Sequence, residues 1–312
     1  MAAFIAPLRK AKRRLSTALD PKCHEAYAKA AKTLDALEAD QRRPLVVHCM
    51  PKVGSMTVIA SLTALNFGDG APIYRPHFYS PDGLKYELSV GADWFGGYEN
   101  LPRKWYCRAE KNRAVADRVM TEGSRALRWK IITMVREPLA NNVSSFFHNN
   151  HWWPDEIRHL VDKSPEIALE KLTQMFFERY PHDLPLQWFD LEVLPMYQLD
   201  VYSTEFPHGR GYQIFTTDKA DILLLRLENL AQEASSAIHN FLGIENFELV
   251  NDNLAADKWY GDMYRRFMRE IELPESYLDR IYQSKMAQHF YSDSELERFR
   301  ARWSRRSPHC YL

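Results

Sequence analysis

Short apolar runs recur along the chain and are separated by longer polar segments. Three of them predict buried strands, at residues 44–50 (PLVVHCM), 128–135 (RWKIITMV) and 220–230 (ADILLLRLENL). A less regular run at 71–80 (APIYRPHFYS) predicts another strand, interrupted near its end by Pro76. Short and almost continuously apolar runs are typical of parallel strands that are covered on both faces.

Helical patterns occupy the segments between these runs. Apolar residues recur at helical spacing from Tyr27 to Leu37 after the typical start Asp20-Pro21, which predicts a helix over residues 21–40. Further helices are predicted at 55–65, at 108–126, from Ser164-Pro165-Glu166 through 184–197, at 231–244 with Gly243 near its end, and in the C-terminal third, where Ser292 and Glu295 are spaced as a capping box.

Strands that alternate with helices predict an α/β fold with a central, mostly parallel sheet flanked by helices. The chain contains no repeat, no low-complexity tract and no strong linker. We therefore expect an N-terminal helical extension (1–43) and a single α/β domain (44–312) whose C-terminal part is helical.

The composition excludes several classes of function. Lys and Arg total 41, as do Asp and Glu, so the overall charge does not favour a nucleic-acid partner and any anion site must be local. The four cysteines are scattered without a metal-ligand spacing, which predicts neither a zinc site nor a disulfide framework and fits a reducing, cytoplasmic compartment. No stretch approaches the roughly 20 apolar residues of a membrane-spanning helix.

The N-terminal segment MAAFIAPLRKAKRRL is basic but lacks the apolar core of a signal peptide. Two interpretations stay open. The segment is either a weak membrane-surface helix, with Phe4 and Leu8 on its apolar side, or a solvated terminus.

The segment VVHCMPKVGSMTVI (46–59) has the pattern of a strand that turns into a helix through an anion-binding loop. A helix N-terminus presents N–H groups and a positive dipole end, to which Lys52 adds a charge. Gly54 permits close approach of the main chain, and Ser55 and Thr57 offer hydroxyl donors. The lysine precedes the glycine, whereas the nucleotide-triphosphate loop has the order Gly-Lys. The loop therefore suits a phosphate or sulfate group better than ATP, although Lys-x-Gly-Ser also occurs by chance in strand–helix turns.

A second predicted strand runs into a similar loop. MVREPLANNVSSFF places Arg136 at the strand end and Ser144 eight residues later, about two helical turns on. Arginine binds phosphate with two hydrogen bonds, which a serine hydroxyl can complete; the alternative is an Arg-Glu surface pair before an ordinary helix. Because ligands of open α/β sheets bind beyond the carboxyl ends of the strands, the two loops favour one ligand with two anionic groups.

These motifs resemble those of sulfotransferases that use 3′-phosphoadenosine 5′-phosphosulfate (PAPS). PKVGSMT is similar to their 5′-phosphosulfate loop, and VREPLANNVSSFF to their 3′-phosphate motif. DNLAADKWYGDMYRRF and YQSKMAQHFYSDSEL resemble the Lys-Trp-Tyr signature and tail of the bacterial family of putative capsular polysaccharide synthesis proteins, which belongs to the same superfamily. The resemblance runs from about Pro44 to Trp303 and implies a P-loop-like, three-layer fold.

The resemblance also implies roles for the matching residues. Lys52 is expected at the bridging oxygen and the sulfuryl group, and Arg136 with Ser144 at the 3′-phosphate. The 5′-phosphate is expected at the turn formed by Val53, Gly54, Ser55, Met56 and Thr57. Lys258, in DKWY, is expected to close over the cofactor, and no metal is expected. Met56 replaces a frequent Thr or Ser of the family, and Asn142 stands where a basic residue is common.

Sulfuryl transfer needs a cation at the leaving phosphate oxygen and a base for the acceptor hydroxyl. Lys52 is the candidate cation. His77 is the candidate base, because it ends the predicted strand 71–80 where several sulfotransferases carry a histidine, and because imidazole titrates near neutral pH. His148 and His151 are alternatives, as bases or as part of the acceptor site, whereas His48 is expected in the core.

The acceptor site is expected from the segments 78–105 and 148–212. Trp152, Trp153 and Trp188 are candidate platforms for a sugar ring, with a core role as the alternative. Arg226 and Glu228, at the end of the last predicted strand, are expected at the same rim, where Glu228 either orients a ligand or starts a helix.

The sequence thus predicts a cytoplasmic, PAPS-dependent sulfotransferase that sulfates a hydroxyl of a polysaccharide or oligosaccharide and releases 3′-phosphoadenosine 5′-phosphate (PAP). Two alternatives remain. One is an ATP-dependent P-loop kinase, against which the Lys-Gly order argues. The other is a catalytically inactive protein that binds glycans during capsule or exopolysaccharide assembly.

Overall fold

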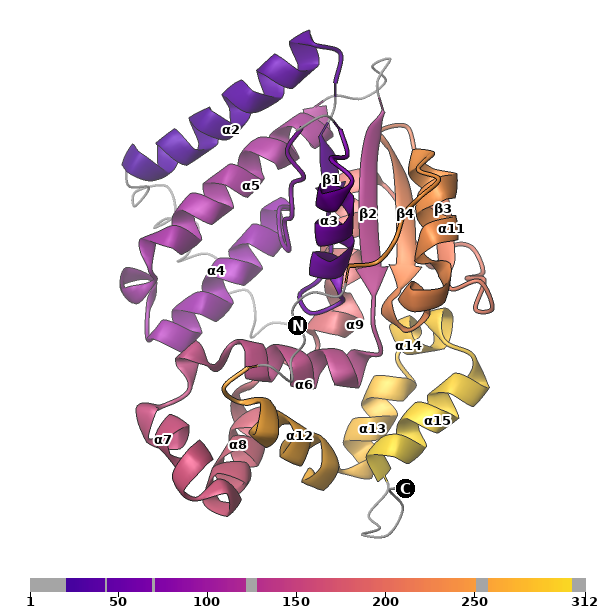
Figure 1. The fold of residues 1–312 in the computed structure, drawn as a ribbon. Helices are drawn as coiled ribbons and strands as arrows, with labels where there is room; N and C mark the ends of the chain where they lie inside the picture. Colours follow the sequence, from indigo (N-terminus) through magenta and orange to yellow (C-terminus); the bar gives the residue numbers. More distant parts are fainter. Residues whose placement is uncertain (1–20, 43, 69–70, 122–127, 251–257, 305–312) are drawn as a thin grey trace.

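An open, four-stranded sheet forms the centre of the described chain (Figure 1). The computed structural model describes residues 21–42, 44–68, 71–121, 128–250 and 258–304. The strands are β1 (Leu45–Val47), β2 (Trp129–Val135), β3 (Tyr212–Thr216) and β4 (Ala220–Arg226), in the order β1-β2-β4-β3. The first two pairs in this order are parallel, and β3 joins β4 as an antiparallel edge. The predicted α/β class with a mostly parallel sheet is confirmed.

The run at 71–80 does not form the predicted strand. Only Tyr74 bridges to β1: its N–H donates to the carbonyl of Leu45 (2.9 Å), and its carbonyl accepts from the N–H of Val47 (2.7 Å). Pro72 and Pro76 on either side have no N–H to extend a ladder. The run at 44–50 is also shorter than predicted, because only three of its residues pair as a strand.

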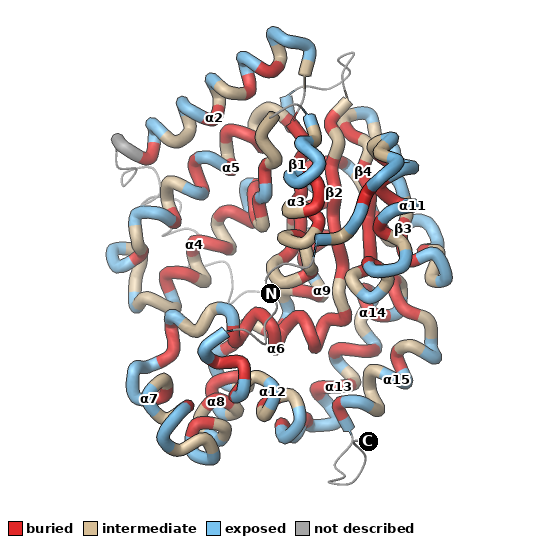
Figure 2. Tube along the Cα trace, viewed as in Figure 1, coloured by how far each residue is buried: buried red, intermediate tan, exposed pale blue. Residues whose placement is uncertain are grey.

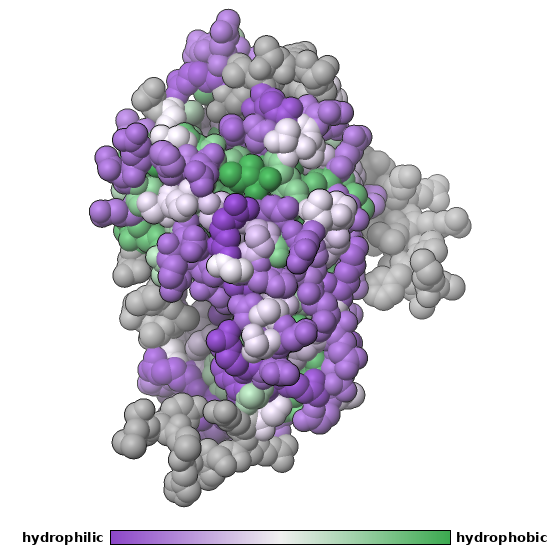
Figure 3. Space-filling model, turned by 90° about the vertical axis from the view of Figure 1, so that its right-hand side faces the viewer, coloured by the Kyte–Doolittle hydropathy of each residue, from purple (hydrophilic) through white to green (hydrophobic). Residues whose placement is uncertain are grey.

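Strand β3 was not predicted from the sequence. Its burial does not alternate regularly, and Ile214 at its centre is 37% exposed. The face of the molecule on the β3 and α11 side is mostly hydrophilic, with a hydrophobic band across its upper part (Figure 3). An edge strand with one exposed face gives a weaker apolar signal than a central strand.

Helices surround the sheet. Their bounds are α2 (Pro21–Ala39), α3 (Ser55–Ala64), α4 (Pro81–Phe95), α5 (Arg103–Thr121), α6 (Pro138–His148), α7 (Asp155–Lys163), α8 (Pro165–Arg179), α9 (Leu184–Trp188), α10 (Leu194–Tyr197), α11 (Leu230–Leu242), α12 (Gly261–Glu270), α13 (Glu275–Tyr282), α14 (Lys285–Phe290) and α15 (Asp293–Ser304). Helices α2, α4 and α5 lie on the β1 side and α11 on the β3 side, while α6 passes below the carboxyl ends of the strands (Figure 1). Buried residues run along β2, β4 and α6 (Figure 2).

The predicted helix at 21–40 is confirmed as α2, which packs along α5. The hydroxyl of Tyr27 donates to Asp117 Oδ2 (2.9 Å), and the Sγ atoms of Cys23 and Cys107 are 2.7 Å apart. Two of the cysteines that are scattered in the sequence therefore meet in the fold. The proposed cap Asp20 and the basic N-terminal segment lie outside the described residues.

The C-terminal helices are joined to the sheet through the predicted capping box. Glu295 Oε2 accepts from the N–H of Ser292 (2.9 Å), as expected at the start of α15. The same carboxylate forms a two-pronged ion pair with Arg226, which is buried at the end of β4 (2.8 and 2.9 Å). One side chain thus caps a helix and fixes it to the sheet.

Within the described ranges, no helix combines the length and apolar character needed to cross a bilayer.

Candidate anion-binding site and adjoining pocket

The loop between β1 and α3 has an unusual backbone. Lys52 has a φ of 66° and Gly54 a φ of 84°, so two residues of one tight turn occupy the left-handed region. A non-glycine residue in this region is uncommon, and such strain is concentrated at functional sites. A Cβ atom on Gly54 would lie 2.5 Å from Leu227 Cδ1, so a side chain at this position would displace Leu227. Among the described residues, no side chain caps the N-terminus of α3, so its first N–H groups are available to a ligand.

The second predicted loop contacts the first directly. The guanidinium Nη1 of Arg136, just after β2, donates to the carbonyl oxygen of Lys52 (2.9 Å). Asn141 Nδ2 in α6 donates to the carbonyl of Pro51 (2.8 Å). The carboxyl ends of two adjacent parallel strands therefore bring the two motifs together, although the contacting residues are 84 and 90 positions apart.

The N-terminus of α6, unlike that of α3, is already occupied. The carboxylate of Glu137 accepts from the N–H groups of Leu139 (3.0 Å) and Ala140 (2.8 Å), and it also accepts from the Tyr282 hydroxyl (2.9 Å). An anion at the second loop would therefore have to use side chains rather than the helix end. Ser144 lies on α6 and is 7% exposed.

Several positive side chains gather around the first loop. Among the described residues, Lys52, Arg75 and Lys258 have no carboxylate partner. Burial, and then the positive charges of Arg136, Lys258 and Arg75, lower the pKa of Lys52 to about 8. A chain with no net charge thus carries a local excess of positive charge that an anion would neutralise.

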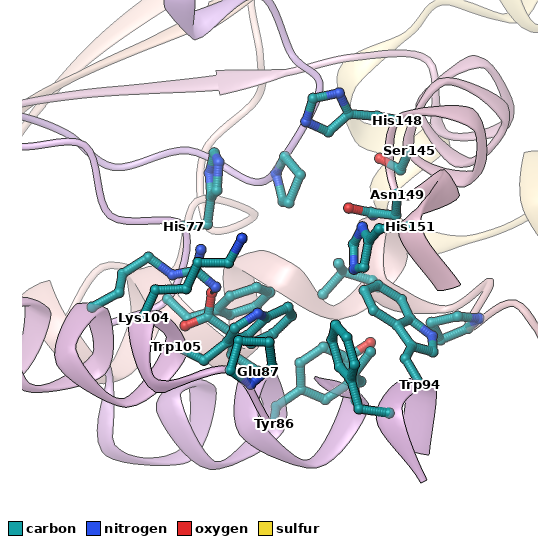
Figure 4. A pocket seen from close by; sticks show the side chains of 18 of the residues that line it. His77, Tyr86, Glu87, Trp94, Lys104, Trp105, Ser145, His148, Asn149 and His151 are labelled. Atoms are coloured by element: carbon teal, nitrogen blue, oxygen red, sulfur yellow. Dashed lines mark ion pairs between the residues drawn. The ribbon is translucent and has the colours of Figure 1, made fainter. Parts of the chain in front are cut away.

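A pocket of about 560 Å³ adjoins this loop (Figure 4). Pro51 lines it at the loop, and helices α4 and α5 supply one wall. In Figure 4, His77 and Lys104 lie across the pocket from Asn149 and His151, which follow the end of α6. The predicted segments 78–105 and 148–212 both contribute to the lining.

His77 has the environment of a neutral base. Its Nδ1 donates to the carbonyl of Cys49 (2.7 Å), which leaves Nε2 as the acceptor nitrogen of the ring. Burial lowers the pKa of His77 to about 4; the bond to the Cys49 carbonyl opposes this shift, and Arg75 and Arg108 add to it. The imidazole is therefore uncharged at neutral pH.

The two alternative histidines line the same pocket. Desolvation, followed by the charges of Lys52 and Lys258, lowers the pKa of His148 to about 4. Desolvation and then the charge of Lys104 lower the pKa of His151. The structure thus brings His77, His148 and His151 to one cavity.

Trp152, Trp153 and Trp188 belong to the core, where they are 8%, 2% and 0% exposed, and none of them lines the pocket. The aromatic wall comes instead from residues that the sequence analysis missed, namely Tyr86, Trp94, Phe95 and Trp105. Trp94 stacks on Trp152 with ring centres 5.8 Å apart, so the two tryptophans are adjacent layers of one aromatic stack. The spacing of Tyr86, Val90 and Trp94 by four residues, after the helix start Ser80-Pro81, is the sequence signal that could have revealed this wall.

Arg226 and Glu228 do not form the expected rim. Arg226 is 2% exposed and paired with Glu295. Glu228 accepts from the N–H of Glu137 (2.8 Å) and from the Tyr291 hydroxyl (3.0 Å). Its carboxylate therefore holds the backbone of the second loop and does not line the pocket.

His48 is buried, as expected. Its Nε2 lies 2.9 Å from Glu192 Oε2, and its Nδ1 lies 3.1 Å from the Tyr197 hydroxyl. Glu192 Oε2 also accepts from the N–H groups of Tyr79 (3.0 Å) and Ser80 (3.1 Å). This network connects β1 to the segment that carries His77. In the part of the chain that the structure describes, no group of three or more His, Cys, Asp or Glu side chains could hold a metal ion.

A family model described as "Putative capsular polysaccharide synthesis protein" (NKWYS) matches residues 163–292. The matched range contains Lys258 and the pocket residues Tyr180, Pro181 and Leu184, but neither the loop at Lys52 nor Arg136. The match associates this part of the chain with polysaccharide synthesis. Searches of curated proteins and of solved structures found no match.

Proposed function

We propose that the protein is a PAPS-dependent sulfotransferase that transfers a sulfuryl group to a hydroxyl of a polysaccharide or oligosaccharide. The observation that supports the proposal most is the direct contact between Arg136 and the backbone of Lys52. PAPS carries anionic groups at the 5′ and 3′ positions of one ribose. Two anion-binding loops that touch each other suit such a ligand, in a P-loop-like arrangement at the ends of β1 and β2.

The residues of the first loop fit a phosphosulfate group. Three features favour a tetrahedral anion: the close approach that Gly54 permits and, among the described residues, the uncapped N-terminus of α3 and the absence of a carboxylate partner for Lys52 and Lys258. We assign the 5′-phosphosulfate of PAPS to the turn from Val53 to Thr57, including Met56. We assign its 3′-phosphate to Arg136 and Ser144. Lys52 Nζ is assigned to the leaving oxygen.

The donor supplies a sulfuryl group attached to a phosphate that leaves as PAP. Lys52 is mostly protonated at neutral pH, since its pKa is about 8, and a protonated amine stabilises negative charge on a leaving oxygen. His77 Nε2 accepts the proton of the acceptor hydroxyl. An anion bound nearby favours the charged imidazole and raises the pKa of His77 from about 4 toward neutrality, which improves it as a base.

The match of residues 163–292 to a polysaccharide synthesis family supports a carbohydrate as the acceptor. The pocket next to the loop is the site that we assign to it, with His148 and His151 at its edge. The proposal places this enzyme in the cytoplasm and requires no metal.

Calorimetric titration of the full chain with PAP tests the proposal, with ATP plus magnesium as a parallel titration. We expect PAP to bind to the wild-type protein, and binding to fall by about two orders of magnitude in Arg136→Ala, because a charge-assisted contact to phosphate is lost. Arg265→Ala is the matched control, since this exposed arginine in α12 pairs only with Asp262 among the described residues.

Absence of PAP binding would overturn the proposal. Magnesium-dependent binding of ATP in its place would identify a P-loop kinase. Binding of saccharides without binding of either nucleotide would identify an inactive glycan-binding protein.

A further inference from the structure

The pocket carries a second group of positive side chains, which shares Arg75 with the group around the loop. Arg75, Lys104 and Arg108 line it, and the first two have no carboxylate partner among the described residues. Arg108 Nη2 binds Glu87 Oε1 (2.8 Å). Lys104 and Arg108 are exposed, so a ligand in the pocket can reach their charged ends.

The charges of the two groups act on different neighbours. The charges of Arg136, Lys258 and Arg75 lower the pKa of Lys52. The charges of Lys104, Arg158 and Arg108 lower the pKa of His151. Arg75 belongs to both groups, because its charge lowers the pKa of Lys52 at the loop and of His77 in the pocket. A donor anion at the loop would neutralise the first group and leave Lys104 without a negative partner in the cavity, whereas Arg108 is already paired with Glu87. The pocket therefore has room for a second anion that does not belong to the donor.

The aromatic wall gives the pocket the surface that a sugar ring requires. Tyr86, Trp94 and Phe95 are half-buried along α4, and Trp105 is buried at the start of α5. Flat aromatic faces with a polar rim bind ligands that are apolar on one face and polar at the edge. Arg108 lies over the Trp105 ring at 4.7 Å, so the positive charge and the aromatic surface are adjacent.

One buried carboxylate oxygen in this pocket is not hydrogen-bonded. Glu87 is 8% exposed, and its Oε2 has no partner among the described residues, while Arg108 holds Oε1. Buried polar atoms are usually paired, so an unpaired acceptor beside a cavity is a position at which a ligand can supply the donor. A hydroxyl group is such a donor, and Arg75 and Lys104 line the same pocket.

We propose that this pocket binds an acidic saccharide. Its ring lies against the aromatic wall of α4 and α5, one hydroxyl donates to Glu87 Oε2, and its negative group lies at Arg75 and Lys104. A carboxylate, a sulfate ester and a phosphate ester share the required charge. The role of this saccharide as acceptor rests on the proposed sulfotransferase function, but its binding requires no donor.

An array of matched acidic and neutral saccharides, probed with the full chain in the absence of PAP, tests the inference. Its arms carry uronic acids, their neutral methyl esters, sulfated sugars and phosphorylated sugars. We expect binding to acidic members and not to their neutral counterparts, and the arm that binds identifies the charged group. Equal binding to both kinds, or no binding to any acidic member, overturns the inference.

Titration of the best acidic member against variants locates the site. Lys104→Gln and Arg75→Gln are each expected to weaken binding about tenfold, as is typical when one charge-assisted contact is lost. Lys32→Gln makes the same charge change at an exposed position on α2 and is expected to leave binding unchanged. Unchanged affinity in both pocket variants overturns the assignment.

The outcomes separate this inference from the proposed function. An acidic saccharide that binds through Lys104 to a protein that does not bind PAP would refute sulfuryl transfer and leave the saccharide site intact. PAP binding without acidic saccharide binding would refute the saccharide site and leave the proposed sulfotransferase function intact.

Discussion

The chemistry of Lys52 depends on its surroundings. Burial and three neighbouring positive charges lower its pKa to about 8, so it titrates within an accessible pH range. Its carbonyl is held by Arg136 and its backbone lies at positive φ. The loop thus fixes both the position and the proton affinity of this amine.

Lys52 should make PAP binding depend on pH. The amine is protonated below pH 8 and loses its charge as pH rises through 8, while phosphate groups are already ionised above about pH 7. We expect the dissociation constant measured by calorimetry to increase about tenfold from pH 7 to pH 9. Lys52→Arg keeps its charge and should give a flat profile. A flat profile in the wild type would show that Lys52 does not contact the anion.

The residues of the two loops could be proposed from the sequence because each motif follows a strong apolar run. Arg75, Glu87 and Lys104 could not, since no local pattern distinguishes a pocket residue from any other polar residue in a loop or on a helix. Their proximity arises only when α4 and α5 pack beside α6. Trp152 and Trp153 are the opposite case, because this conspicuous aromatic pair suggested a binding site but is buried in the core.

At the level of elements, the π-helical turn Phe189–Val193 between α9 and α10 determines how α4 begins. This turn aims Glu192 at the start of α4, where Ser80 Oγ donates to Glu192 Oε1 (2.8 Å) and accepts from the N–H of Gly83 (2.8 Å). A Cβ atom on Gly83 would lie 1.4 Å from Glu192 Oε1, so only glycine allows this approach.

Gly83→Ala should therefore displace Glu192 from its buried network. The expected loss is about 3 kcal/mol or more of the free energy of unfolding, because a buried carboxylate loses its partners. Chemical denaturation measures it. Gly209→Ala is the control, since a Cβ there meets no atom within 4 Å. Equal stability of the two variants would contradict the observed packing of α4 on the turn.

The central strands and the helices with strong caps or apolar periodicity were predictable, as α2, α3 and α11 show. The segment 71–80 was not, because its apolar residues resemble a strand while its prolines prevent one. Helix α4 was missed because its start, Ser80-Pro81, directly follows that misleading run. The local sequence pattern gave a wrong prediction where a strand-like apolar run overlapped a helix start.

At the scale of the whole molecule, the ion pair between Arg226 and Glu295 connects the sheet to the C-terminal helices. The arginine side chain is 2% exposed and the carboxylate 15% exposed. Arg226 Nη1 also donates to the carbonyl of Phe290 (2.9 Å). These contacts predict that the C-terminal helices unfold together with β4.

Glu295→Gln should destabilise the entire chain rather than only its C-terminus. Breaking a buried pair leaves an uncompensated charge, and we expect a loss of about 3 kcal/mol in a single unfolding transition. The double variant Arg226→Met/Glu295→Leu should lose less free energy of unfolding than the sum of the losses in Arg226→Met and Glu295→Leu. A double-mutant cycle measures this difference. A separate early transition in Glu295→Gln would show that the C-terminal helices unfold independently.

The contact between Arg136 and Lys52 spans 84 positions and has a kinetic consequence. Contacts between distant residues form slowly, because the intervening chain must be closed first. β1 pairs with β2, and β2 with β4, in parallel, so no local hairpin builds these pairs. Neither loop can reach its final shape in a short fragment. During synthesis, the two loops can meet only after β2 and Arg136 have left the ribosome.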